Sequence, residues 1–282
     1  MKPQLYQEKT KFWCDRDLGN LELLRATYVS HTFSRHTHEG YAIGVVEAGI
    51  EGFRYQGANH IAPPSSIPII HPGEVHTGYA ATESGWTYRM FYPETHILQK
   101  AASEVADCFQ PLPYFPSAVI QDIQLAAQLR YLHICIENSA SKLEKESLLI
   151  WTFARLISKY AQTPPPIKPI SPEIFAVKLT QEYLKANYAE NISLEQLSNL
   201  VNLKPLRLLR VFRKALGLPP HAYLVQVRIT EAKKLLARGM SIVDVAIETG
   251  FNDQSHLHRH FKRHVGVTPG NYVTGFKERI IA

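Results

Sequence analysis

Two short stretches of the chain carry imidazoles that could share one site. His36 and His38 alternate in the sequence HTH, and His76 ends the sequence PGEVH. Because successive side chains of a strand point to opposite faces, His36 and His38 would lie on the same face. The Pro-Gly turn would direct His76 toward them from a neighbouring strand, into the interior of a barrel. The spacing therefore predicts one cavity that contains these three imidazoles, with Tyr41 and Tyr88 beside them.

Three interpretations of this predicted cavity stay open. The imidazoles and tyrosines can serve as hydrogen-bonding groups for a small-molecule effector, and we take this as the main hypothesis. Three imidazoles can also bind a metal ion. They can otherwise be polar side chains that are satisfied inside a barrel. The chain contains no nucleophile–base arrangement, Walker loop or dinucleotide-binding fingerprint. We therefore expect a protein that is not an enzyme, with no cofactor and no metal.

A second group of residues could contact nucleic acid, and it belongs to an internal repeat. The sequence LHRHFKRHVGVTPGNY, residues 257–272, follows the pattern of LLRVFRKALGLPPHAY, residues 208–223. Leu, Arg, Phe, Gly, Pro and Tyr recur at matching places, and two cations follow the Phe in both copies. A repeat of this length usually marks a supersecondary unit that is used twice.

The second copy predicts a helix, a tight turn and another helix. Ser241 is a good N-cap for the first helix. Gly250 can adopt the left-handed conformation that a tight turn requires. Asp253 can cap a second helix that runs from about residue 254 to residue 265. This pattern is a helix-turn-helix over about residues 241–265.

The first copy has the same organisation over about residues 193–216. Ser193 caps the leading helix, and Asn202 occupies the turn because Asn tolerates the left-handed conformation better than other non-glycine residues. Pro205 is well placed at the start of the second helix. Between the copies, the amphipathic stretch HAYLVQVRITEAKKLLARG predicts a long helix that holds both units at a fixed separation.

The outward faces of the two second helices carry the side chains that recognition of a major groove needs. Arg can bind guanine, Gln can bind adenine, and an exposed Leu can meet a thymine methyl group. Further cations would neutralise phosphates. The predicted DNA-binding residues are Leu206, Arg207, Leu209, Arg210, Arg213, Gln254, Ser255, His256, His258, Arg259 and Lys262. The predicted inward residues are Leu208, Val211, Phe212, Ala215, Leu257, His260, Phe261 and His264. The alternative is a helical bundle in which Leu206 and Leu209 form a protein contact.

The net charge of +6 belongs to the part of the chain that contains the repeat. From Ser171 onward there are 16 Lys and Arg against 9 Asp and Glu, which is +7, whereas the preceding residues hold 15 against 16, which is −1. A one-sided basic domain is typical of a protein that binds nucleic acid.

The positions of prolines and of β-rich segments divide the chain. Residues 20–118 contain short β-branched and aromatic runs between Gly and Pro, with a hairpin expected around Ala48-Gly49. Residues 121–138 and 141–162 predict two helices, which could cap this domain or dimerise. The stretch PPPIKPIS predicts a linker at residues 164–172. The fold class is therefore α+β with two domains: an antiparallel β-barrel with following helices at 1–163, and an all-α domain at 173–282.

The repeated segments resemble the C-terminal domain of the AraC/XylS family of bacterial transcription regulators. The resemblance covers about Ile174 to Ile281, and GFNDQSHLHRHFKRHVGVTPGNY is similar to the signature stretch of the family. The resemblance implies that Arg210 and Arg259 lie where family members read bases. It also implies that the first half is a cupin-like barrel that senses a small molecule and helps the protein to dimerise.

The stretches HTHEGYAIGVVEAG and PGEVH are similar to the two cupin motifs, with His36, His38 and His76 at the metal-ligand positions. The Glu that the cupin pattern has a few residues after the second His is missing, because Glu39 comes too early and Glu47 too late. This departure argues against a metal-dependent enzyme.

The function expected from these observations is that of a sequence-specific, effector-controlled transcription regulator, taken as an activator. The alternative is a metal-dependent cupin enzyme fused to a DNA-binding domain. The expected partners are double-stranded DNA, an unknown small-molecule effector, RNA polymerase if the protein activates, and a second copy of the chain if the helix pair dimerises. No stretch has the roughly 18 uninterrupted apolar residues of a membrane span, and the first residues contain no signal-peptide core. We therefore expect a cytoplasmic protein with no membrane partner.

Overall fold

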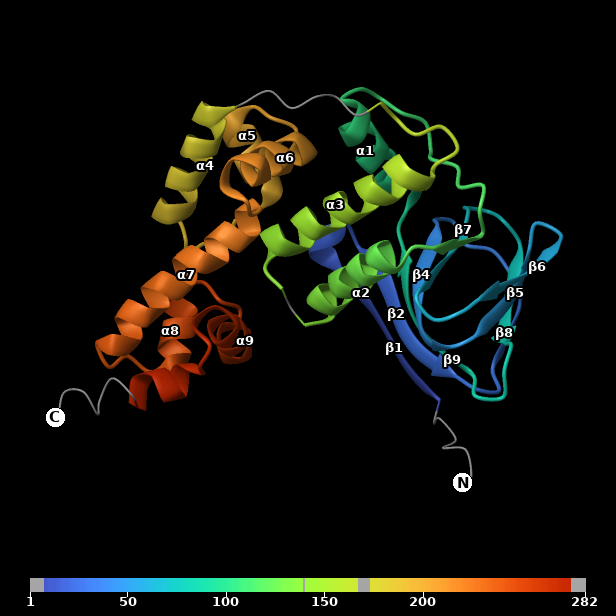
Figure 1. Cartoon of the computed structure of the whole chain (residues 1–282), viewed down its shortest axis with the longest axis horizontal. Helices are drawn as coiled ribbons and strands as arrows, with labels where there is room; N and C mark the ends of the chain where they lie inside the picture. The colour runs from blue at the N-terminus through green and yellow to red at the C-terminus, as the bar shows by residue number, and fades with distance from the viewer. Residues whose placement is uncertain (1–7, 139, 167–172, 275–282) are drawn as a thin grey trace. The chain divides into compact units, whose positions relative to one another are not determined.

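The computed structural model describes residues 8–138, 140–166 and 173–274. Its contacts divide the chain into two compact units (Figure 1). The first contains Met1–Ile136 and Leu149–Lys168, and the second contains Glu137–Leu148 and Pro169–Ala282. Most of the predicted linker, residues 167–172, lies outside the described residues. The domain boundaries at 163 and 173 therefore stay a prediction.

The first unit is built from two antiparallel sheets. A six-stranded sheet has the order β1-β2-β9-β4-β7-β10, and a four-stranded sheet has the order β3-β8-β5-β6. The strands are β1 (Lys9–Asp15), β2 (Leu21–Tyr28), β3 (Thr32–His36), β4 (Ala42–Gly49), β5 (Glu51–Tyr55), β6 (Ala58–Ala62), β7 (Ser66–Ile70), β8 (His76–Ala80), β9 (Trp86–Tyr92) and β10 (Val119–Gln121). The sheets curve around a common interior (Figure 1), which confirms the predicted antiparallel β domain.

An aromatic core joins the two sheets. Val46 and Trp86 from the six-stranded sheet pack in one cluster with Phe53, Tyr55 and Ala62 from the four-stranded sheet, and all five side chains are buried. Burial of such apolar surface is the main favourable contribution to folding. Several side chains of this cluster also line the pocket described below.

The predicted hairpin around Ala48-Gly49 is wrong. β4 pairs with β7 and β9, whereas β5 pairs with β6 and β8, so the chain passes here from one sheet to the other. Gly49 has φ +67°, and a Cβ atom on it would lie 2.0 Å from the Gly85 carbonyl oxygen. The real hairpin joins β5 and β6 through Gln56 and Gly57, which have φ of 48° and 79°. Positive φ at both central residues is typical of the turn that matches the twist of a hairpin.

Helices follow the strands of the first unit. They are α1 (Thr95–Ala106), α2 (Ile123–Glu137) and α3 (Lys142–Tyr160), and the last two confirm the helices predicted at 121–138 and 141–162. Asp122 accepts hydrogen bonds from the Leu125 amide at 3.1 Å and from Lys159 Nζ at 2.6 Å. One carboxylate thus caps the start of α2 and ties it to the end of α3.

The second unit is helical and contains both predicted helix-turn-helix units. Its helices are α4 (Ile174–Ala186), α5 (Leu194–Val201), α6 (Pro205–Leu216), α7 (Pro220–Ala237), α8 (Ile242–Glu248) and α9 (Gln254–Val265). Ser193 and Gln196 form a reciprocal capping box at the start of α5. Asn202 and Gly250 have the predicted left-handed conformation, with φ of 52° and 73°. The long helix α7 runs from the first helix-turn-helix unit to the second (Figure 1).

Candidate DNA interface and ligand pocket

The outward face of α9 has the predicted composition. Its exposed side chains include Gln254, Ser255, His258, Arg259 and Lys262. The Asp253 carboxylate accepts from the His256 amide at 2.6 Å and so caps the end of the helix that carries Gln254 and Ser255. The helix therefore presents amide, hydroxyl and cationic groups along one face, which is what contact with base edges and phosphates requires.

Two residues of α9 lie elsewhere than predicted. His256 is only 2% exposed, and its ring packs against Phe251 and His260 with centroid distances of 5.3 and 4.7 Å. It sits under the turn before α9, one helical turn from His260, and so belongs to the interior. His264, which was predicted to face inward, is exposed beyond the end of this cluster. The prediction was wrong for both residues, because the packing of α9 against α7 and α8 is centred on Leu257 and Phe261.

On α6 the prediction of exposed leucines is wrong. Leu206 and Leu209 are 5% and 1% exposed, because α4, α5 and α7 all contact this helix and cover more than one of its faces. Ala215, predicted to be buried, is exposed. Leu206 and Leu209 therefore contribute to the core of the second unit rather than to its surface.

The cations of α6 stay at the surface to different degrees. Arg213 is exposed, whereas Arg207 and Arg210 are half-buried. Arg207 donates through Nε and Nη2 to Glu173 Oε1 at 3.0 and 2.6 Å. Desolvation, and then the nearby charge of Arg207, lower the pKa of Arg210. The first helix-turn-helix unit therefore presents a smaller basic face than the second.

The α2–α3 corner, residues 137–148, packs against both helix-turn-helix units. Glu146 Oε2 accepts from the Leu194 amide at the start of α5 at 2.7 Å. The Arg259 guanidinium donates to the Asn138 carbonyl oxygen at 3.2 Å. One predicted base-reading side chain therefore already has a hydrogen bond to the backbone of this corner.

Arg228, which was not among the predicted functional residues, organises the interior of the second unit. This side chain is 2% exposed and donates to the carbonyl oxygens of Tyr188 and Glu190 at 2.7 and 2.8 Å. Burial lowers its pKa to about 10, so the guanidinium stays charged at neutral pH. It holds the loop between α4 and α5. A single cation on the apolar face of the α7 sequence was the signal that could have identified it.

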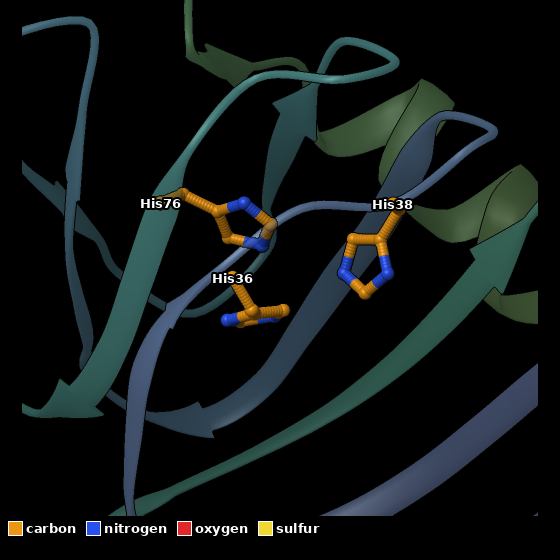
Figure 2. Close-up of side chains that lie close together, drawn as sticks. All are labelled: His36, His38 and His76. Atoms are coloured by element: carbon orange, nitrogen blue, oxygen red, sulfur yellow. The ribbon is translucent and has the colours of Figure 1, made fainter.

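In the first unit, His36, His38 and His76 converge (Figure 2). Their ring centroids lie 4.2 Å apart for His36 and His76, 4.9 Å for His36 and His38, and 5.0 Å for His38 and His76. The pairing of β3 with β8 places His36 directly opposite His76. His38 follows the end of β3 instead of lying on the strand, and its ring reaches the same place from the loop.

Hydrogen bonds to the backbone determine where two of these rings carry their protons. His36 Nδ1 lies 2.8 Å from the Ser34 carbonyl oxygen, and His76 Nδ1 lies 3.1 Å from that of Glu74. A carbonyl oxygen can only accept, so both Nδ1 atoms donate. Burial, and then the neighbouring imidazoles, lower the pKa of His38 to about 4, and burial lowers the pKa of His76 as well. At neutral pH the Nε2 atom of His76 therefore offers a lone pair.

These imidazoles line a pocket between the two sheets. It encloses about 510 Å³, including the part open to solvent, and its walls include Phe33, Glu51, Phe53, Tyr88 and Tyr92. Glu51 is buried, and its Oε2 has no hydrogen-bond partner among the described residues. Burial raises the pKa of this carboxyl to about 8. The pocket therefore combines aromatic walls with a few polar groups, as ligand sites do.

Tyr41 does not lie in this pocket, although Tyr88 does. The Tyr41 hydroxyl donates to the Pro113 carbonyl oxygen at 2.7 Å, and its ring packs beside His71. His71 is buried and accepts through Nε2 from the Phe115 amide at 2.9 Å. Tyr41 is thus a fully bonded core residue, in contrast to its predicted place with the three imidazoles.

Comparison with known proteins gives the same two-part organisation. Residues 18–153 match the family of AraC-like ligand binding domains, and residues 197–275 match a helix-turn-helix domain family. The chain is 33% identical over 238 residues to the uncharacterized HTH-type transcriptional regulator YbfI of Bacillus subtilis, a match that covers 84% of this chain and 86% of that protein.

Shorter and more distant similarities were also found. The bifunctional transcriptional activator/DNA repair enzyme AdaA of Bacillus subtilis is 33% identical over 97 residues, which is 34% of this chain and 46% of AdaA. Among solved structures, ToxT from Vibrio cholerae is 14% identical with a TM-score of 0.37, over 95% of this chain and 98% of that one.

No described helix of this chain combines the length and the apolar character that crossing a membrane demands. Three findings indicate the same family. They are the match to the ligand-binding domains, the match to the helix-turn-helix domains, and the relative that is matched over most of its length. The chain belongs to the AraC family of helix-turn-helix transcriptional regulators.

Proposed function

We propose that this regulator recognises specific DNA sequences through the outward faces of α6 and α9. The observation that carries the proposal is the exposed set of Gln254, Ser255, His258, Arg259 and Lys262 on α9. On α6 the contacts come from Arg207, Arg210 and Arg213. Arg210 and Arg259 read bases, and Lys262 and Arg213 neutralise phosphates. Leu206, Leu209 and His256 are left out of this interface because they are buried.

A small-molecule effector controls this activity from the pocket between the two sheets. His36, His38, His76 and Tyr88 line that pocket together with Glu51, whose Oε2 atom is buried without a hydrogen-bond partner among the described residues. A ligand that supplies the missing hydrogen bonds binds one arrangement of the domain better than another and shifts its population. Tyr41 takes no part, because its hydroxyl already bonds inside the core.

Further properties follow from this role. AdaA carries the name of a transcriptional activator, which supports activation and contact with RNA polymerase here as well. The α2–α3 pair provides the surface for a homodimer. A regulator of this kind works in the cytoplasm, where its DNA is, and it carries out no enzymatic reaction.

Selection of bound fragments from a random DNA pool by the full-length protein tests this function. A shared sequence motif should emerge, and binding to it should weaken as salt rises, because phosphate contacts release counterions. The selection is repeated with candidate metabolites to find the effector. Recovery of no common motif, at any salt concentration that permits binding, would contradict sequence-specific recognition.

A further inference from the structure

The three imidazoles of the pocket offer more than hydrogen bonds. One ring nitrogen from each of His36, His38 and His76 lies within 4.8 Å of those of the other two (Figure 2). Two nitrogens bound to one tetrahedral zinc ion at 2.0–2.1 Å lie about 3.4 Å apart. Small ring rotations that move each nitrogen by about one ångström would therefore bring all three nitrogens to a common ion.

The hydrogen bonds behind the rings favour such an ion. The Nδ1 atoms of His36 and His76 donate to the carbonyl oxygens of Ser34 and Glu74. This is the outer-shell arrangement that orients metal-binding imidazoles, because it leaves the Nε2 lone pair free for the metal.

The groups that line the pocket also favour a cation over an anion. The described residues that line it include one carboxyl group, Glu51, and no Lys or Arg. The other side chains of the wall are apolar or carry hydroxyl groups, as in Thr77, Tyr88 and Tyr92. No Lys or Arg side chain among these residues would attract an anion, whereas a cation would find three imidazoles and a carboxyl group.

A second cluster of candidate ligands, in the helical unit, has the opposite proton arrangement. Atoms of Glu144, His256 and His260 also lie within 4.8 Å of one another. The His256 Nδ1 atom, however, accepts from the Asn252 amide at 3.3 Å, so in the neutral ring the proton is on Nε2. The protonated Nε2 atom is buried without a hydrogen-bond partner among the described residues and offers no lone pair in this form of the ring. This cluster therefore serves as an internal comparison.

We propose that His36, His38 and His76 bind one divalent transition-metal ion, of the class that imidazole ligands prefer, such as Zn²⁺, Co²⁺ or Ni²⁺. Three protein ligands would leave coordination positions open within the pocket that Glu51, Tyr88 and Tyr92 also line. In a further step that rests on the proposed function, the effector is a small molecule with an oxygen or nitrogen donor that occupies an open position. The metal ion then forms part of the effector site.

Titration of the full-length, chelator-stripped protein tests the metal site. Calorimetry with Zn²⁺ and absorption spectroscopy with Co²⁺ should both give one ion per chain, with nitrogen-ligand bands in the Co²⁺ spectrum. His38→Ala and His76→Ala should weaken binding by more than the roughly 10–100-fold that loss of an outer-shell partner costs. Two matched controls should keep the affinity of the original protein: His60→Ala, on β6 outside the cluster, and Glu144→Gln, in the second cluster.

Each outcome decides one of the two claims. If no ion binds, or if binding survives in His38→Ala and His76→Ala but is lost in Glu144→Gln, the proposed site is wrong. Should either histidine variant unfold, as judged by circular dichroism, His38→Gln and His76→Gln repeat the comparison. Binding of the selected DNA is measured in the same preparations. An effector response that is unchanged in the metal-free protein would remove the metal from the effector site and leave the regulatory function standing.

Discussion

At the scale of single residues, we expect different roles for the two cations Arg259 and Lys262, which are both exposed on α9. Arg259→Ala should cost about 1–3 kcal/mol of DNA-binding free energy and relax the base preference at one position. Lys262→Ala should instead weaken binding to all sequences alike and flatten its salt dependence. Binding titrations against the selected site and its single-base variants measure both effects, and Arg210→Ala provides the equivalent test on α6. Equal, sequence-independent losses would contradict the assigned roles.

Arg259 allows one more comparison at this scale. Its guanidinium donates to the Asn138 carbonyl oxygen of the α2–α3 corner. This hydrogen bond must be exchanged or shared when the side chain contacts a base. Part of the effect of Arg259→Ala therefore arises in the free protein, and the stability of the variant without DNA has to be measured beside its affinity.

Glu51 gives a prediction about pH. Burial raises its pKa from the ordinary value of 4.5 to about 8, so between these values the folded protein binds a proton that the unfolded chain has released. The free energy of unfolding should therefore fall as pH rises from 4.5 to 8 and then level off. Glu51→Gln should remove this loss and stabilise the metal-free protein at pH 8 by an amount on the order of a few kcal/mol, with little change at pH 4.5.

Urea unfolding of the metal-free protein at both pH values measures this effect. Glu83→Gln, which changes an exposed carboxyl of the same unit, is the control and should alter stability little at either pH. An equal gain from the two substitutions would show that net charge, and not the burial of Glu51, is responsible.

At the scale of elements, the turns of the two helix-turn-helix units use different residues for one conformation. Gly250 has φ +73°, and a Cβ atom there would lie 2.5 Å from the Ala189 carbonyl oxygen. Gly250→Ala should therefore lower the stability of the second unit by roughly 1–3 kcal/mol, from backbone strain and displacement of the neighbouring loop. Asn202→Gly, at an exposed position with φ 52°, should change stability by less than about 1 kcal/mol.

Urea unfolding followed by helical circular dichroism compares these two variants directly. A loss in Asn202→Gly as large as that in Gly250→Ala would mean that the Asn202 side chain, and not its conformation, maintains the turn. The structure gives a reason for the difference. Only the turn at Gly250 has another backbone segment, at Ala189, packed against it closely enough to exclude a side chain.

At the scale of the whole molecule, we expect helix α7 to determine how the two helix-turn-helix units meet DNA. One continuous helix, Pro220–Ala237, joins them, so α6 and α9 should contact segments about one helical turn apart, roughly 10 bp centre to centre. Insertion of five base pairs between these segments turns one of them to the opposite side of the duplex. This insertion should abolish specific binding in a gel-shift assay. Insertion of a full helical turn of DNA should also weaken binding, because α7 fixes the distance between α6 and α9.

Tolerance of the five-base-pair insertion would show that the two units read DNA independently. A change in the protein that uncouples the two helix-turn-helix units tests the same point. The α2–α3 corner provides a second connection between the two helix-turn-helix units, because its Glu146 accepts from the Leu194 amide and its Asn138 carbonyl oxygen accepts from Arg259. Its contribution can be measured with Glu146→Gln, which weakens the acceptor for the Leu194 amide.

The sequence by itself determined the helices of the second unit and their turns. Caps, a left-handed Asn or Gly and an amphipathic period act over a few residues, so α5, α6, α8 and α9 could be placed from local signals alone. The sequence also predicted one place for His36, His38 and His76, but the pairing of β3 with β8 and the loop that carries His38 bring them together. The tertiary structure decided the rest. Leu206 and Leu209 are buried by helices that approach from elsewhere, and Gly49 leads to another sheet because strand pairing joins residues distant in the sequence.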